Sequence, residues 1–238
     1  MISEMFAHGF IQRAFIGGVL VSLCAALLGV SLVLKRYSMI GDGLSHVSFG
    51  ALSIAIALGF APIKFSIPIV IIAAFFLLRL AENGKMKSDA AIAMVSASSL
   101  AIGVIVTSLT TGLSTDVWSY MFGSILAMSK DDVIFSVVLS VVVLIMFGFC
   151  YHRIFAVTFD ESFSKATGVK VGMYNTLISI FTAVTVVLGI KMMGAMLISS
   201  LIIFPALTSM RVFKSFLSVT ICSATVSYTH LTLPTTPY

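Results

Sequence analysis

The sequence predicts an all-α fold, a polytopic transmembrane helical bundle of about eight spans. Hydrophobic residues fill 59% of its 238 positions and charged residues 10%, whereas charged residues make up about 25% of a typical soluble domain. Apolar segments recur at about the 20 residues that a helix needs to cross a bilayer core. The strict apolar/polar alternation of a membrane β-barrel is absent from the sequence. Helices, rather than strands, are therefore expected to cross the membrane.

Apolar segments predict seven spans and an eighth that begins near Phe213. The seven are residues 14–34, 44–60, 65–80, 90–109, 133–151, 173–190 and 192–210. The N-terminal stretch MISEMFAHGFIQR has neither the basic region nor the small-residue cleavage site of a signal peptide. The first span is therefore expected to be retained.

Basic residues predict how the bundle is oriented. If the spans alternate in direction, ten of the 14 lysines and arginines share one side of the membrane. These are Lys35, Arg36, Arg79, Lys85, Lys87, Arg153, Lys165, Lys170, Arg211 and Lys214, and the other four are Arg13, Lys64, Lys130 and Lys191. Because cytoplasmic loops carry an excess of basic residues, the larger group is expected to be cytoplasmic and the N-terminus outside.

This topology requires residues 114–132, STDVWSYMFGSILAMSKDD, to start and finish outside. Trp118 and Tyr120 suit a membrane interface, and the MFGSILAM core is too short to span. A short outer or re-entrant helix is expected here. If the stretch did span, every later segment would face the opposite side.

The polar interruption at residues 152–173 falls on the predicted cytoplasmic side. Within it, FDESFSKATGV predicts a short helix that Asp160 or Ser162 caps and that Gly168 ends in a left-handed conformation. Phe159, Phe163 and Ala166 are expected to share one face. Two interpretations fit this pattern: a loop helix that lies on its own protein, and a docking helix for a cytoplasmic partner.

Asp42 and His46 stand four residues apart at the start of an apolar segment. Positions i and i+4 share a helix face, and carboxylate with imidazole suits zinc and other first-row divalent metals. The alternative is that Asp42 caps the helix and His46 is a hydrogen-bonded interior histidine. Ionisable side chains at membrane depth usually face a bundle interior or a polar cavity, which favours the metal site. Two ligands leave it incomplete, so water, carbonyls or a second copy must complete it.

The segment GIKMMGAMLISSLIIFPALTSM carries small residues that permit close helix approach. Pro205 lacks a backbone donor, which predicts a kink or break in the helix there. Transporters often place such breaks beside a substrate path, although ordinary bundle packing explains the small residues equally well.

Motifs of other protein classes are missing. The sequence has no GxxxxGK[ST] phosphate loop, HExxH or GxSxG, so we expect neither an ATPase site of its own nor an enzyme. Its three cysteines show no ligand-like spacing. Basic residues lie in short links and form no amphipathic face, so no nucleic-acid partner is expected.

Four stretches, in this order, resemble the membrane permeases of bacterial zinc, manganese and iron ABC importers. They are LVLKRYSMIGDGLSHVSFGALSIAIALG, YMFGSILAMSKDDV, VTFDESFSKATGVKV and VLGIKMMGAMLISSLIIFPAL. The resemblance implies a type II ABC importer-like permease that forms a homodimer, surrounded by lipid in a bacterial cytoplasmic membrane. It also implies cytoplasmic ATP-binding subunits, an extracytoplasmic metal-binding protein, and a divalent metal as substrate with no bound cofactor.

The resemblance assigns roles to particular residues of this chain. Asp42 and His46 are expected to lie on the metal path, and Pro205 near it. The expected ATPase-coupling residues are Phe159, Asp160, Glu161, Phe163, Lys165, Ala166 and Gly168. Two other functions stay open: a metal-responsive membrane interaction or sensor protein, and the permease of a metal-chelate ABC importer.

The C-terminal residues 227–238, SYTHLTLPTTPY, are polar and threonine-rich, unlike the spans before them. Members of the family that the chain resembles continue through further apolar helices. Residues 1–226 are therefore expected to form a permease domain that is cut short at its C-terminus. Residues 227–238 are expected to be a foreign tail, in which His230 is no ligand.

Overall fold

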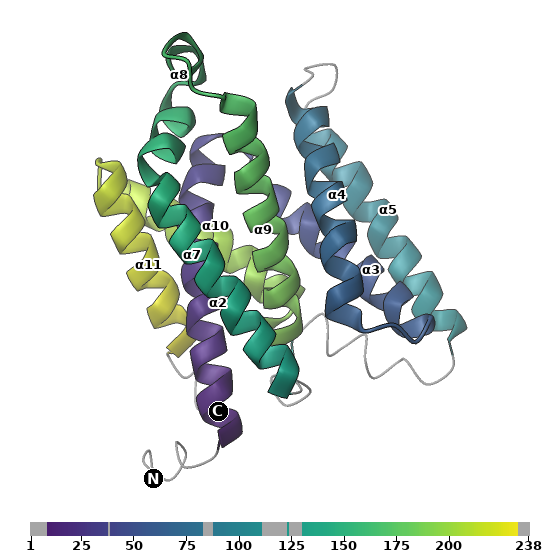
Figure 1. The fold of residues 1–238 in the computed structure, drawn as a ribbon. Coiled ribbons are helices and arrows are strands. Elements are labelled where there is room, and N and C mark those ends of the chain that lie inside the picture. Colours follow the sequence, from purple (N-terminus) through teal and green to yellow (C-terminus); the bar gives the residue numbers. More distant parts are fainter. Residues whose placement is uncertain (1–8, 38, 83–87, 111–122, 124–129, 233–238) are drawn as a thin grey trace.

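The computed structural model describes residues 9–37, 39–82, 88–110, 123 and 130–232. Every regular element in these ranges is a helix, which confirms the all-α prediction. The helices are α2 (Gly9–Leu34), α3 (Ile40–Ala57), α4 (Pro62–Glu82), α5 (Ser88–Leu109), α7 (Lys130–Phe159), α8 (Glu161–Ala166), α9 (Val171–Met193), α10 (Ala195–Val212) and α11 (Phe216–Thr232). The long helices lie side by side in one bundle, and the short α8 stands at one end of it (Figure 1).

Seven of the described helices are long and apolar enough to cross a membrane, and they correspond to the seven predicted spans. The eighth helix of the bundle, α11, has 17 residues and begins at Phe216 rather than near Phe213. Two boundaries differ from the prediction in ways that matter for function. Helix α3 begins at Ile40, before Asp42, and α7 continues to Phe159.

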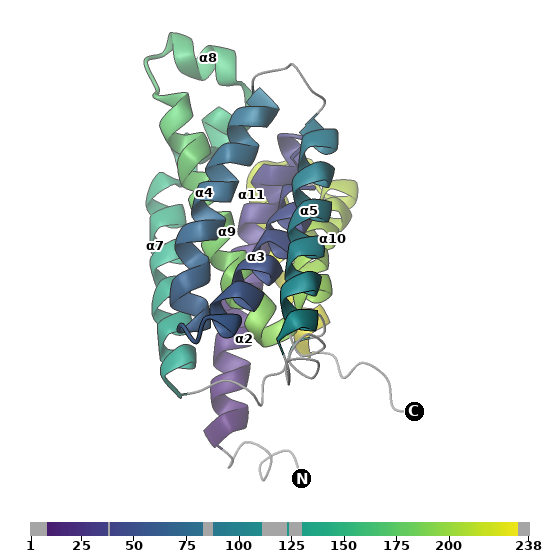
Figure 2. The ribbon, with the colours of Figure 1, turned by 90° about the vertical axis from the view of Figure 1, so that its right-hand side faces the viewer.

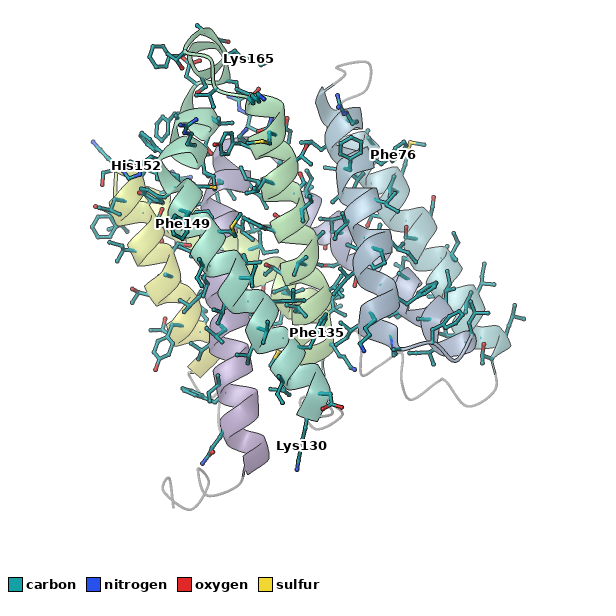
Figure 3. All side chains as sticks on the ribbon, in the orientation of Figure 1. Phe76, Lys130, Phe135, Phe149, His152 and Lys165 are labelled. Atoms are coloured by element: carbon teal, nitrogen blue, oxygen red, sulfur yellow. The ribbon has the colours of Figure 1, made fainter. Side chains whose placement is uncertain are left out.

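The ends of the helices confirm the alternating topology. Lys130 at the start of α7 and the N-terminal end of α2 lie at the end of the bundle opposite Lys165 of α8 (Figure 3). Helix α5 ends on the side of the bundle on which α7 begins, as the predicted topology requires (Figure 1). The interfacial helix expected within residues 114–132 falls outside the described residues, apart from Gly123 and residues 130–132. Lys85 and Lys87 lie outside them too.

Helices α3 and α9 form the centre of the bundle. In the most apolar 18-residue stretch of each span, 78% of the residues are buried in α9 and 72% in α3, against 17% in α5. Helix α3 packs against α4, α5, α9 and α10, and in the rotated view it passes between α4, α5 and α9 (Figure 2). Polar side chains on α3 are therefore held by neighbours on several sides.

Glycines let two pairs of helices approach closely. A Cβ added to Gly29 of α2 would lie 2.0 Å from the carbonyl oxygen of Ile202 in α10. A Cβ on Gly50 of α3 would lie 2.8 Å from the carbonyl oxygen of Ser99 in α5. Because lipid offers as much apolar contact as another helix does, membrane helices gain from this close backbone packing.

Helix α10 is continuous through Pro205, so this proline does not break the helix, whereas a kink there stays a prediction. The break between the last long spans lies at Gly194, where φ is 87° and ψ is 162°. A proline removes one backbone donor, which a packed membrane helix tolerates. The positive φ at the break is a conformation that glycine adopts without a Cβ clash.

Helix α11 includes part of the predicted foreign tail. It continues to Thr232, and the Ser227 hydroxyl donates a hydrogen bond to the Ser22 carbonyl oxygen of α2 at 3.0 Å. The foreign origin of residues 227–238 stays a prediction, and residues 233–238 fall outside the described part of the chain.

Replacing Gly29 with alanine should lower the thermal unfolding midpoint of the protein in detergent. The new methyl group would overlap the Ile202 carbonyl oxygen, and such overpacking costs about 1–3 kcal/mol. Gly148→Ala in α7 is the matched control, because its added Cβ meets nothing within 4 Å. Equal midpoints for the two variants would contradict this account of the α2–α10 contact.

Candidate functional site

Asp42 and His46 lie on one face of α3, as their spacing predicts. Asp42 Oδ2 is 3.7 Å from His46 Nε2. Two ligand atoms on a tetrahedral ion with bonds of about 2.0–2.1 Å lie about 3.3 Å apart, so small side-chain rotations would let this pair share one cation. The two residues therefore fit the expected metal chemistry in type and in separation.

Partial exposure distinguishes this pair from the rest of α3. The side chain of Asp42 is 42% exposed and that of His46 26%, whereas the residues directly beside them are buried. These buried neighbours are Gly41, Gly43, Ser45 and Val47. The pair forms an open polar spot on a helix that is otherwise covered by its neighbours.

Asp42 is not the helix cap, so the alternative explanation for this residue is wrong. Met39 occupies the N-cap position, without a side-chain cap hydrogen bond, and α3 begins at Ile40. Asp42 lies inside the first turn, where the positive end of the helix dipole still favours a carboxylate. Its charge is available to a ligand because no backbone cap occupies it.

The described residues bring no complete set of metal ligands together. No group of three or more His, Cys, Asp and Glu side chains forms within them. Additional ligands to a cation at Asp42 and His46 would have to be water, backbone oxygens, residues outside the described part, or a second copy of the chain.

A pair of serines joins α3 to α10 beside His46. The hydroxyl oxygens of Ser45 and Ser199 are 3.0 Å apart. Each hydroxyl also lies near a carbonyl oxygen of its own helix, Gly41 at 2.8 Å and Ala195 at 2.9 Å. Two hydroxyl protons can serve only two of these three contacts at once. The sequence identified Ser199 only as a small residue, and nothing in the sequence pairs it with Ser45.

The short helix predicted after Phe159 is present as α8. The backbone N–H of Phe163 donates to Asp160 Oδ1 at 2.9 Å, so Asp160, rather than Ser162, is the cap. Gly168 follows the helix with a φ of 83°, as expected. The short helix, its N-terminal cap at Asp160 and the left-handed glycine after its C-terminal end are therefore confirmed.

The face of α8 is largely open. Phe163 is 65% exposed, Lys165 and Ala166 are also exposed, and Ser164 is the buried residue of the helix. Phe159 belongs to the end of α7 rather than to α8; it is 60% exposed, and its ring centroid lies 4.9 Å from that of Phe155. One face of α8 is thus open to a partner, and both interpretations of the helix, as a loop helix on its own protein and as a docking helix, stay predictions.

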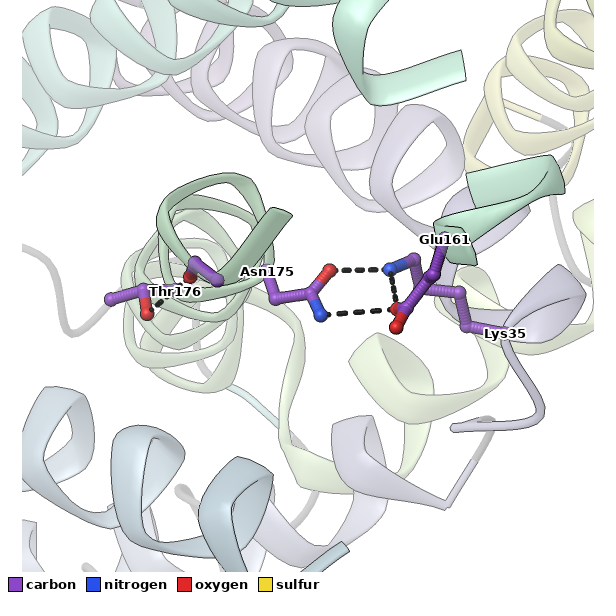
Figure 4. A network of polar contacts seen from close by, with 5 residues as sticks. Lys35, Glu161, Asn175 and Thr176 are labelled. Atoms are coloured by element: carbon purple, nitrogen blue, oxygen red, sulfur yellow. Dashed lines mark hydrogen bonds and ion pairs between the residues drawn. The ribbon is translucent and has the colours of Figure 1, made fainter. Parts of the chain in front are cut away.

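Glu161 is the residue of α8 that turns toward the bundle (Figure 4). Lys35, which follows α2, donates from Nζ to Glu161 Oε1 at 2.8 Å and also to Asn175 Oδ1 of α9. Asn175 Nδ2 donates to Glu161 Oε1 at 3.1 Å. We call these three residues the polar clamp. It ties α8 to the end of α2 and to α9.

Burial of the lysine makes the polar clamp strong. The Lys35 side chain is only 6% exposed, and a buried ammonium is costly unless it is paired and hydrogen-bonded. Partial burial of Glu161 would raise the pKa of its carboxyl, but hydrogen bonds from Lys35 and Asn175 and the charges of Lys35 and Lys165 outweigh it. The pKa of Glu161 therefore lies below its ordinary value of 4.5, which favours the ionised form.

Sequence reasoning missed the polar clamp. Lys35 entered the prediction only as a topological charge, and Asn175 did not enter it. The two partners of the ion pair are 126 positions apart, and no local pattern in the sequence signals such a contact. Glu161 was expected among the coupling residues, and the structure gives its carboxylate bonds within the bundle.

The fold is that of a polytopic membrane protein: a bundle of spanning helices with an open polar pair on a central helix and an exposed helix at one end. The comparisons with known proteins agree. The chain belongs to the ABC 3 transport family, whose sequence model matches residues 7–236.

Several curated relatives are similar over most of the chain. A probable metal transport system membrane protein of Treponema pallidum is 32% identical, with 90% of this chain and 80% of that protein covered. The manganese import system permease protein ScaB of Streptococcus gordonii is 28% identical, with 90% and 77% covered. The high-affinity zinc uptake system membrane protein ZnuB of Haemophilus influenzae is 28% identical, with 83% and 76% covered.

A solved structure shares the fold. PsaBC from Streptococcus pneumoniae, determined in complex with Fab, superposes with a TM-score of 0.83 at 28% identity. The match covers 96% of this chain and 84% of that one.

The polar clamp predicts how α8 responds to acid. Because the pKa of Glu161 is lower than 4.5 in the folded protein, its ion pair stabilises the α8 attachment above that pH. This contribution is lost as the pH falls through the folded-state pKa. Hydrogen-exchange protection of α8 amides should therefore be constant from neutral pH down to pH 4.5 and should decrease below it.

Glu161→Gln provides the control for that measurement, because its side chain keeps its size and cannot titrate. In this variant the hydrogen-exchange protection of the α8 amides should be weaker at neutral pH, and it should not decrease further on acidification. An identical acid step in the wild type and in Glu161→Gln would show that another group controls the attachment.

Proposed function

We propose that this chain is the permease subunit of an ATP-driven importer of a divalent metal ion in a bacterial cytoplasmic membrane. Membership of the ABC 3 transport family supports the class of transporter. The observation that carries the substrate is the Asp42–His46 pair, two metal-ligand side chains at 3.7 Å on a central and otherwise buried helix. A charge in such a place is costly, and a cation path gives it a reason to be there.

The metal is zinc, manganese or ferrous iron. Carboxylate with imidazole accepts all three, and geometry and supply select among them more than affinity does. Relatives named for manganese import and for zinc uptake are equally similar to this chain, at 28% identity each. Zinc is a slightly better match because histidine is a good zinc ligand.

Incomplete ligation suits transport. A closed cage of four protein ligands holds zinc as a structural ion, whereas two protein ligands with water in the remaining positions allow release. In this mechanism the cation exchanges part of its water shell for Asp42 and His46 and then leaves them. The carboxylate lowers the electrostatic cost of the cation in the bundle, and the neutral imidazole fixes its position.

The functional unit in this proposal contains further chains. A second copy of the permease would face the exposed side of Asp42 and His46 and supply matching ligands across a dimer axis. A cytoplasmic ATP-binding subunit would dock on α8, where Phe163 and Lys165 are exposed. A metal-binding protein outside the membrane would deliver the ion at the opposite end of the bundle.

Reconstitution tests the proposal. The permease is placed in liposomes with its ATP-binding subunit and metal-binding protein, and uptake of zinc, manganese and ferrous iron is followed in competition. ATP-dependent accumulation of at least one of these ions is expected. Metal binding without ATP-dependent uptake would instead support the sensor interpretation, and uptake only of a metal chelate would support the chelate importer.

Asp42→Asn should lower uptake by about tenfold or more, a loss typical of damaged metal sites. Asparagine keeps the size and the helix-start preference of aspartate but loses the charge, and His46→Ala should have a similar effect. Expression and thermal midpoint serve as controls, since neither variant should change them much. Wild-type uptake by Asp42→Asn would contradict a role of this residue on the metal path.

Phe163→Asp should weaken the association of the ATP-binding subunit, because an exposed aromatic side chain on α8 is replaced by a charge. Metal uptake should fall as this association weakens. The permease itself should stay folded, because the Phe163 side chain is 65% exposed. Phe163→Leu is the matched control, which retains an apolar contact and most of the activity. Normal binding and uptake by Phe163→Asp would mean that the partner docks elsewhere.

A further inference from the structure

The polar clamp connects the exposed helix to the segment that carries Asp42. Glu161 belongs to α8, Asn175 to α9, and Lys35 to the turn between α2 and α3 (Figure 4). In the described part of the chain, the hydrogen bonds of Glu161 are the ones that join an α8 side chain to other helices. A force applied to α8 therefore reaches the α2–α3 turn through Lys35.

In the link between α2 and α3, the described residues on both sides of residue 38 are hydrogen-bonded to the ends of the two helices. The Arg36 N–H donates to the Val33 carbonyl oxygen at 3.0 Å and the Tyr37 N–H to that of Leu32 at 2.8 Å. The Ile40 N–H donates to the Tyr37 carbonyl oxygen at 3.0 Å, which connects the turn to the start of α3. These bonds connect the segment that carries Lys35 to the start of α3.

Backbone conformation in this turn is unusual. Arg36 has a φ of 61°, the left-handed value that glycine normally supplies, and it is the non-glycine residue with a positive φ among the described residues. Residues outside the preferred regions persist where their surroundings hold them, and they often occur in segments that switch. Asp42 follows within the first turn of α3.

A crevice lies beside the helix on the other side of the polar clamp. A crevice of about 430 Å³ separates α4 from the first part of α9. It runs from Gly172 to Phe181 along α9 and is lined on α4 by Leu78 and Arg79. Asn175 therefore lies on a helix end that is packed less tightly than the rest of α9, where residues 181–190 are all buried.

We propose that Lys35 and Glu161 are positioning residues that couple movement of α8 to the Asp42–His46 pair, through the α2–α3 turn. The inference rests on the proposed function, in which α8 receives the ATP-binding subunit. Because the Lys35 ammonium is buried, separating it from Glu161 leaves an unpaired charge, which is strongly unfavourable. The two segments therefore move together, and closure of the ATP-binding subunits shifts the start of α3.

Charge reversal tests this coupling in the complete reconstituted importer. Lys35→Glu and Glu161→Lys are each expected to keep ATP hydrolysis and to transport about 2- to 30-fold less metal per ATP, the range of coupling energies found along such connections. The double variant restores one charge of each sign. The amount of metal that the double variant transports per ATP should return to within about twofold of the wild-type value. The Asn175 amide can rotate so that its nitrogen donates to the new glutamate and its oxygen accepts from the new lysine.

Lys214→Glu is the matched control. It reverses the charge of an exposed lysine between α10 and α11, and its ratio of metal to ATP should stay that of the wild type. Lys35→Arg, which keeps the charge, should retain more coupling than Lys35→Gln. If a reversal variant fails to fold, the comparison of Lys35→Arg with Lys35→Gln carries the test.

Two results would overturn the inference. The first is that Lys35→Glu and Glu161→Lys each transport as much metal per ATP hydrolysed as the wild type does. The other is a proportional fall of hydrolysis and uptake that leaves the ratio unchanged, which would give the polar clamp a structural role in subunit assembly. Failure of the proposed function looks different, because the wild-type importer itself would then show no ATP-dependent metal uptake.

Discussion

The cost of placing ionisable groups inside an apolar bundle is the constraint on which the rest of this structure depends. The chain meets it in two ways. Lys35 is almost fully buried and is neutralised by Glu161 and Asn175. Asp42 and His46 are left partly exposed and too far apart for a hydrogen bond. The first arrangement joins helices to one another, and the second leaves a partly open polar pair, which the proposed function assigns to the transported cation.

Close helix packing keeps both arrangements in place. Gly29 lets α2 approach α10, and Gly50 lets α3 approach α5. Ser45 and Ser199 add a polar contact between α3 and α10 next to His46. Helix α3, which carries Asp42 and His46, is thus packed against neighbours on several sides, while the side chains of these two residues stay partly exposed.

Local patterns predicted the parts of this protein that depend on nearby residues. Apolar runs gave the seven spans, and Asp160 with Gly168 gave α8, because a span or a cap is determined within a few positions. A break at Pro205 was expected, but α10 continues through that residue, and the chain leaves the helical conformation at Gly194 instead. The ion pair of Lys35 and Glu161 was missed because only the folded chain brings these residues together.

The central claim is that Asp42 and His46 contact the transported ion. Anomalous X-ray scattering from crystals of the assembled importer, grown with manganese and measured near its absorption edge, tests this directly. The account predicts an anomalous peak within about 2.0–2.5 Å of the Asp42 carboxylate and of His46 Nε2. A peak at other residues, with Asp42 and His46 facing lipid or packed away from the ion, would contradict it.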